Sequence, residues 1–212
     1  MSTTQVPRQR AIIDRRRLAS EIGSLVEEHG EQARGPVVQL LKTALDKGRA
    51  ELESRLEAKP SAGHENAGGF AFLIDQLIRV IHDHATTHLY PSANRSQAER
   101  LTVIAVGGYG RAEMSPHSDV DVAFLVGGKK TAWCEQVVEA MLYLLWDLGL
   151  KVGHSTRTLD EAMRLSKKSR SGLAWSSSPT RSMPSQEGQM VPFPLLSGAS
   201  TIHPSSTSSW PP

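Results

Sequence analysis

The chain of 212 residues contains a single cysteine, Cys134. One thiol excludes an internal disulfide framework and a zinc site built from several thiolates, which is typical of proteins in a reducing compartment. The chain also lacks any run of about 18 apolar residues, the length of a membrane span, and residues 1–17 lack the apolar segment of a signal peptide. We therefore expect a soluble, cytoplasmic protein.

The chain also has no large excess of positively or negatively charged residues. The chain has 24 Lys and Arg against 22 Asp and Glu, a formal net charge of +2. A nearly balanced charge offers no general electrostatic attraction for nucleic acids or for anionic membrane surfaces. We therefore expect neither a nucleic acid nor a membrane among the partners.

Residues 1–97 are expected to form a helical N-terminal extension. Apolar residues recur at three- and four-residue spacing within 8–29, within 36–56 and, most regularly, within 70–90, as they do on the buried face of a helix. The polar, glycine-rich stretch 61–69 is interpreted as a linker before the third of these helices.

Residues 98–168 are expected to form a small sheet with packed helices, because the hydrophobic period changes here. Short apolar runs rich in β-branched residues are typical of buried strands, and longer apolar stretches of helices. The expected elements are strands at 101–106, 119–126 and 151–157 and helices at 131–148 and 159–168, the last capped by Thr158 or Asp160. This order places the chain in the α+β class.

Residues 169–212 have a different composition. Serine and proline dominate them, Glu187 is their only acidic residue, and neither helical nor strand periodicity is present. Such a segment cannot bury enough apolar surface to offset the entropy of ordering, so we expect it to be disordered and not to pack.

The residues between the first two expected strands carry the chemistry. Asp119 and Asp121 are two positions apart on a strand, so both carboxylates project from one face while Val120 points into the core. Two like charges on one face favour a bound cation, and Mg²⁺ prefers carboxylate and phosphate oxygens. The pair predicts a metal site suited to a nucleoside triphosphate.

A glycine-rich turn precedes these carboxylates. Gly107, Gly108 and Gly110 lack Cβ atoms, so backbone N–H groups can approach phosphate oxygens, and a short helix beginning there directs its positive end at the same charge. Arg111 supplies a cation and Ser118 a hydroxyl donor to the same region. Together with the carboxylates, the turn predicts a nucleotide-binding site.

The segment GGYGRAEMSPHSDVDVAFL (107–125) resembles two groups of proteins. A glycine turn followed by an acidic-apolar-acidic strand resembles the nucleotidyltransferase superfamily that includes DNA polymerase beta. The longer pattern, with residues 70–165 around it, closely resembles the bifunctional uridylyltransferase/uridylyl-removing enzymes of bacterial nitrogen regulation. Ala112 departs from the glycine usual in that family. The implied fold is a DNA polymerase beta-like domain with an N-terminal helical extension.

The resemblance implies an activity and its site. In that family this domain transfers UMP from UTP to a tyrosine of the PII signal protein, with Mg²⁺ or Mn²⁺. Carried over, Asp119 and Asp121 would hold the metal ions, and Gly107 and Gly108 would contact the triphosphate. The nucleophile would belong to PII.

The same resemblance implies that the domain is incomplete at its C-terminal end. The superfamily needs a third carboxylate on a later strand, and the hydrolase and glutamine-sensing domains of the family are not found in the sequence. A one-base shift in codons for residues 169–175 would restore the family continuation Thr-Ile-Arg-Thr-Gly-Leu, so a frameshift is our hypothesis and a natural disordered tail the alternative. Two other functional interpretations stay open: a catalytically inert domain, and transfer to a different acceptor.

Several other side chains have simpler interpretations. His82, His84 and His88 are interpreted as packing residues of a helix rather than metal ligands, and Cys134 as a buried small apolar residue. His154 either faces the nucleotide or packs, and Glu113 either takes part in the site or forms only a local salt bridge.

Overall fold

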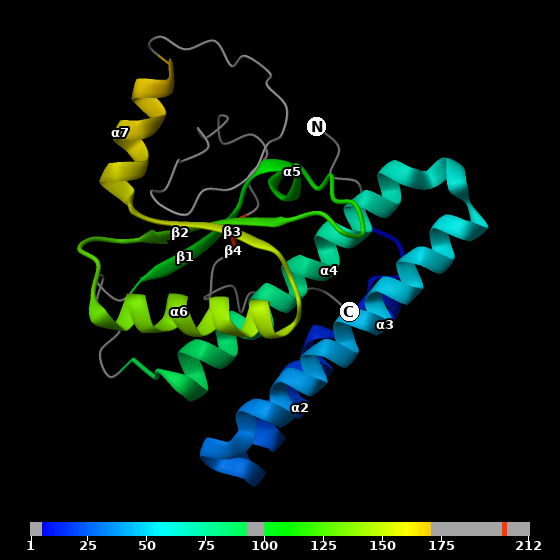
Figure 1. Ribbon diagram of the computed structural model, residues 1–212, viewed down its shortest axis with the longest axis horizontal. Helices are drawn as coiled ribbons and strands as arrows, with labels where there is room; N and C mark the ends of the chain where they lie inside the picture. The colour runs from blue at the N-terminus through cyan, green and yellow to red at the C-terminus, as the bar shows by residue number, and fades with distance from the viewer. Residues whose placement is uncertain (1–5, 93–99, 171–200, 203–212) are drawn as a thin grey trace, which may run out of the picture.

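The computed structural model describes residues 6–92, 100–170 and 201–202. Helices α1 (Gln9–Ile12), α2 (Arg15–His29), α3 (Arg34–Ala58) and α4 (Gly63–His84) make up its first part, with short 3₁₀ turns at Gly30–Ala33 and Pro60–Ala62 and a π-helical turn at Ala85–Leu89. In Figure 1, α4 runs between the pair α2 and α3 and the layer that holds the sheet. The expected boundary between extension and core, at residues 97 and 98, lies outside the described residues.

The single helix expected over residues 8–29 is wrong, because the chain breaks between α1 and α2. Ile13 is extended (φ −160°, ψ 135°), and Asp14 caps α2 by accepting a hydrogen bond from the Arg17 amide at 3.2 Å. Successive residues of a helix point about 100° apart. The break lets the neighbours Ile12 and Ile13 both enter the core.

The linker expected over residues 61–69 is also wrong, since α4 begins at Gly63. Gly69 serves close packing instead. A Cβ atom on Gly69 would lie 2.5 Å from Cδ2 of Leu52 on α3, and Asn66 donates a hydrogen bond to the carbonyl of Leu52 at 3.0 Å. Small residues at this crossing let α3 and α4 approach each other, which local sequence patterns do not reveal.

The expected strands and helices of the second part are confirmed within one or two residues. They are β1 (Leu101–Ala105), α5 (Gly107–Gly110), β2 (Val120–Val126), α6 (Ala132–Asp147), β3 (Val152–Thr158) and α7 (Leu159–Arg170). β2 lies between β1, to which it is antiparallel, and β3, to which it is parallel. Thr158 caps α7: its hydroxyl accepts from the Glu161 amide at 3.2 Å, and Glu161 accepts from the Thr158 amide at 2.9 Å.

The structure differs from the expectation that nothing after Lys168 would pack. α7 continues to Arg170, and Thr201–Ile202 forms a two-residue strand, β4, antiparallel to the outer edge of β1. An edge strand presents unpaired N–H and C=O groups that a short β-branched segment can satisfy. Residues 171–200 and 203–212, on which the rest of that expectation falls, lie outside the described residues.

The two faces of the sheet have different roles. The residues of β2 that point to one face are almost fully buried: Val120, Val122, Phe124 and Val126. α6 lies on this face, whereas α5 and α7 lie on the other side (Figure 1). The α+β class is therefore confirmed. Within the described residues no helix is long and apolar enough to cross a membrane.

Candidate active site

Asp119 and Asp121 lie at the start of β2, on the face opposite the buried valines. Asp119 is exposed, and Asp121 is half-buried within the strand. Burial first, and then the charge of Asp119, raises the pKa of the Asp121 carboxyl. The like-charge repulsion expected from the sequence is therefore present, and a cation between the two carboxylates would relieve it.

Two glycines leave the space that the Asp121 carboxylate occupies. Gly107 has a positive φ of 60°, and a Cβ atom there would lie 2.9 Å from Oδ2 of Asp121. Gly153, which pairs with Asp121 across the β2–β3 ladder, approaches Oδ1 so closely that a Cβ atom would clash with it. The sequence analysis missed Gly153; its signal was a glycine inside a strand pattern, a common mark of close approach.

The glycine turn is joined directly to the carboxylate strand. The Val106 amide donates to the backbone carbonyl of Asp121 at 3.0 Å. The Gly110 amide donates to Val106 at 2.9 Å, and the Glu113 amide to Gly108 at 2.9 Å. The Gly110 amide is therefore already hydrogen-bonded within the turn. Of the three glycines predicted to contact phosphate, Gly107 and Gly108 are better placed to donate, because they precede these bonds.

Arg111 and Ser118 both stabilise the loop that joins β1 to β2. The Arg111 guanidinium donates to the Gly107 carbonyl at 3.0 Å and to Glu113 at 2.8 Å, which is the local salt bridge considered for Glu113. The Ser118 hydroxyl oxygen accepts from the Ser115 amide at 2.8 Å. These contacts hold the loop in shape, and the Ser118 hydroxyl proton can still be donated to a ligand.

Ala112 adopts a left-handed conformation with φ of 58°. An L-residue with a Cβ atom is strained there, whereas glycine is not. The departure from glycine noted in the sequence therefore falls at a position whose backbone favours glycine.

The donor set fits a hard divalent cation. Two carboxylates on one face, with room left by two glycines, suit Mg²⁺ or Mn²⁺, whose remaining ligands would come from phosphates and water. Within residues 6–92, 100–170 and 201–202 no group of three or more His, Cys, Asp or Glu side chains is arranged so that it could hold a metal ion. The third carboxylate of the superfamily pattern is therefore not among the described side chains at this site.

His154 lies apart from these carboxylates, and His84 and His88 belong to the end of α4 and the turn after it. His154 pairs in register with Val122 and contacts the Trp146 ring of α6, with centroids 6.3 Å apart, so it lies on the opposite face of the sheet from Asp121. The rings of His84 and His88 are 5.6 Å apart. Burial, and to a smaller extent the charge of His88, lowers the pKa of His84 to about 4.

Comparison with known proteins agrees with this geometry. Residues 61–167 match the family described as "Putative nucleotidyltransferase DUF294". The chain is 60% identical over 168 residues to a bifunctional uridylyltransferase/uridylyl-removing enzyme of Erythrobacter litoralis, covering 79% of this chain and 18% of that protein. No solved structure shows significant similarity.

Two further relatives carry the same name. One, from Novosphingobium aromaticivorans, is 61% identical over 163 residues, and one, from Azospirillum brasilense, is 45% identical over 167 residues. These cover 77% and 78% of this chain, which spans only 18% of the length of each relative. Because the family match covers half of the sequence and includes both carboxylates and the glycine turn, the chain belongs to the DUF294 nucleotidyltransferase family.

Proposed function

We propose that this domain transfers UMP from UTP to a tyrosine hydroxyl of a PII signal protein in the cytoplasm and releases pyrophosphate. The observation that supports it best is the pair Asp119 and Asp121 on one sheet face beside the Gly107–Gly108 turn. The names of the relatives support the choice of uridylyl group. We also propose that the sheet and its helices belong to the DNA polymerase beta-like fold.

In this proposal each element has one task. Asp119 and Asp121 hold Mg²⁺ or Mn²⁺, which supplies charge neutralisation at the phosphates when bound. Gly107 and Gly108 present backbone N–H groups to the triphosphate. Arg111 keeps the turn in shape through the Gly107 carbonyl.

The transfer itself is an in-line displacement. The acceptor tyrosine oxygen forms a bond to the α-phosphorus of UTP as the bond from that phosphorus to the bridging oxygen of the β-phosphate breaks. The acceptor proton leaves to a base that is not identified among the described residues. Pyrophosphate carries away the electron pair of the broken bond.

The test is transfer of labelled UMP to purified PII protein by the full 212-residue chain. We expect Asp119→Asn and Asp121→Asn each to lower the rate by at least about a hundredfold, because each removes one of two anionic ligands. Asp160→Asn, an exposed aspartate at the start of α7, is the matched control and should leave the rate unchanged. Full activity in both site variants would refute the metal assignment.

A second candidate function is nucleotide binding without transfer. It is favoured by the absence, within the part of the chain that the structure describes, of a third acidic side chain beside the two aspartates. Saturable binding of UTP with Mn²⁺, combined with no label on PII or on any other acceptor, would select this candidate.

A further inference from the structure

Tyr109 is the buried anchor of the glycine turn. Its side chain is 5% exposed and belongs to the same hydrophobic core as residues of α4, yet its hydroxyl has no hydrogen-bond partner in the described part of the chain. Burial first, and then the charge of Asp75, raises the pKa of Tyr109 well above its usual value. The hydroxyl therefore keeps its proton and is an unused hydrogen-bond donor.

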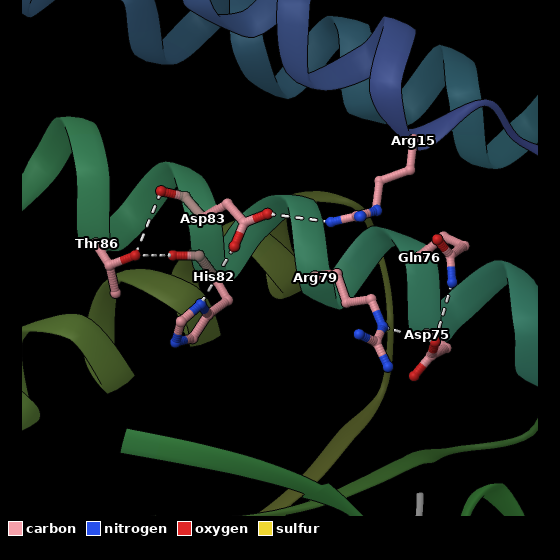
Figure 2. A network of polar contacts seen from close by, with 7 residues as sticks. All are labelled: Arg15, Asp75, Gln76, Arg79, His82, Asp83 and Thr86. Carbon is pink, nitrogen blue, oxygen red and sulfur yellow. Dashed lines mark hydrogen bonds and ion pairs between the residues drawn. The ribbon is translucent and has the colours of Figure 1, made fainter. Parts of the chain in front are cut away.

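Asp75 of α4, whose charge acts on Tyr109, offers an unused acceptor. Its Oδ2 accepts from the Arg79 guanidinium at 2.9 Å and from the side-chain amide of Gln76 at 3.0 Å. Figure 2 shows Asp75 and Arg79 extending from one side of α4, while Asp83 meets Arg15 of α2 on the other. Oδ1 of Asp75 is buried and has no partner among the described residues.

A buried donor and a buried acceptor that influence each other electrostatically are unfavourable while they stay unpaired. The turn they would fasten is short, since α5 has only four residues and cannot be stable by its own hydrogen bonds. Its position relative to Asp121 must therefore come from tertiary contacts, which include those with β1 and β2 and the burial of Tyr109 in the core.

We propose that Asp75 is a positioning residue for nucleotide binding: the Tyr109 hydroxyl donates to Oδ1 of Asp75 when phosphates bind the Gly107–Gly108 turn. The inference rests on the proposed function. It gives the helical part of the chain a role in that function, because the contact ties α4 to the turn beside the carboxylates. The Arg79–Asp75 ion pair occupies Oδ2 and leaves Oδ1 of Asp75 available as an acceptor.

The test is a double-substitution experiment on the full chain. The dissociation constant of UTP is measured with Mn²⁺ present, and that of Mn²⁺ is measured alone. Tyr109→Phe and Asp75→Leu should each weaken UTP binding by roughly tenfold, and the pair together also by roughly tenfold, because either change removes the same bond. Mn²⁺ affinity without UTP should not change.

Controls separate positioning from general damage to the fold. Tyr143→Phe removes the hydroxyl of an exposed tyrosine on α6 and should have no effect. Asp75→Asn keeps an acceptor oxygen and should restore most of the UTP affinity lost in Asp75→Leu.

Three results would overturn the inference. Wild-type affinity for UTP in Tyr109→Phe would overturn it alone, and so would a roughly hundredfold loss in the double variant, which indicates independent effects. Absence of UTP binding by the unsubstituted chain would instead refute the proposed function, and the inference with it.

Discussion

The helices α2, α3 and α4 and the loop between β1 and β2 are built on opposite principles. The helices bury regular apolar stripes, so that Leu41, Leu45 and Leu77 are fully inaccessible to solvent. The loop instead contains a left-handed alanine and a glycine with positive φ, and it ends at the two neighbouring carboxylates, of which Asp121, on β2, has a raised pKa. Local strain and repulsion occur where a ligand would bind, and the packed helices provide the stability that tolerates them.

The largest effect should come from the helical region. Leu77→Ala removes a fully buried side chain from α4 and should lower the free energy of unfolding by about 3–5 kcal/mol. Leu89→Ala, at a residue that is 43% exposed, is the matched control and should cost less than about 1 kcal/mol. Urea unfolding followed by circular dichroism measures both. Equal losses would contradict the contrast between the two regions.

A second prediction concerns acid sensitivity of the same helices. The pKa of buried His84 is lowered to about 4, from a usual value near 6.5. The folded state therefore binds a proton less readily than the unfolded state. This part of the stability is complete above about pH 6.5 and is lost as the pH falls toward 4, up to about 3 kcal/mol.

His84→Phe should remove that dependence. Unfolding free energies at pH 7, 5 and 4 should fall more steeply for the unsubstituted chain than for the variant. His64→Phe, at an exposed histidine of α4, should retain the full acid dependence. Identical slopes for all three proteins would show that His84 does not carry it.

A third prediction tests the space around Asp121. Gly153→Ala places a methyl group against the carboxylate and should weaken Mn²⁺ binding by roughly 10- to 100-fold, the range seen when a ligand's surroundings are disturbed. Gly128→Ala, where a Cβ atom has nothing within 4 Å, should bind as before. Isothermal titration calorimetry measures both. Unchanged Mn²⁺ affinity in Gly153→Ala would mean that Asp121 does not need the space that Gly153 leaves.

A fourth prediction concerns the strained turn. Ala112→Gly should raise the free energy of unfolding by about 0.5–1 kcal/mol, because glycine adopts the observed φ of 58° without strain. Ala44→Gly in the middle of α3 should lower it by about 1 kcal/mol, since glycine is unfavourable within a helix. Thermal unfolding of both variants checks that the signs are opposite.

The smallest effect should come from relieving the repulsion between the aspartates. Because the pKa of Asp121 is raised, the folded chain holds the proton of this carboxyl more tightly than the unfolded chain does. The folded chain therefore loses stability as the pH rises through that pKa. At pH 7 without metal, Asp121→Asn should therefore stabilise the chain by about 0.5 kcal/mol after allowance for solvent screening. The gain should disappear in acid, where Asp121 is itself neutral, and Mn²⁺ should raise the melting temperature of the unsubstituted chain only.

Some errors of sequence interpretation have a common physical cause. The linker expected before residue 70 is the start of α4, and the helix expected over residues 8–29 is broken at Ile13. In both places the deciding factor is a contact between distant segments, either the α3–α4 crossing or the burial of Ile12 and Ile13 together. Local propensity contains no information about such contacts.

The amino-acid order by itself determined the strands β1, β2 and β3, the helices α6 and α7, the glycine turn and the shared face of Asp119 and Asp121. These follow from hydrophobic period and backbone chemistry within a few residues. Only the tertiary structure decided that Gly153 borders Asp121, that His154 lies on the opposite face, and that the charge of Asp75 on α4 acts on buried Tyr109. Strand pairing and helix packing join segments tens of residues apart. No local pattern specifies which residues then meet.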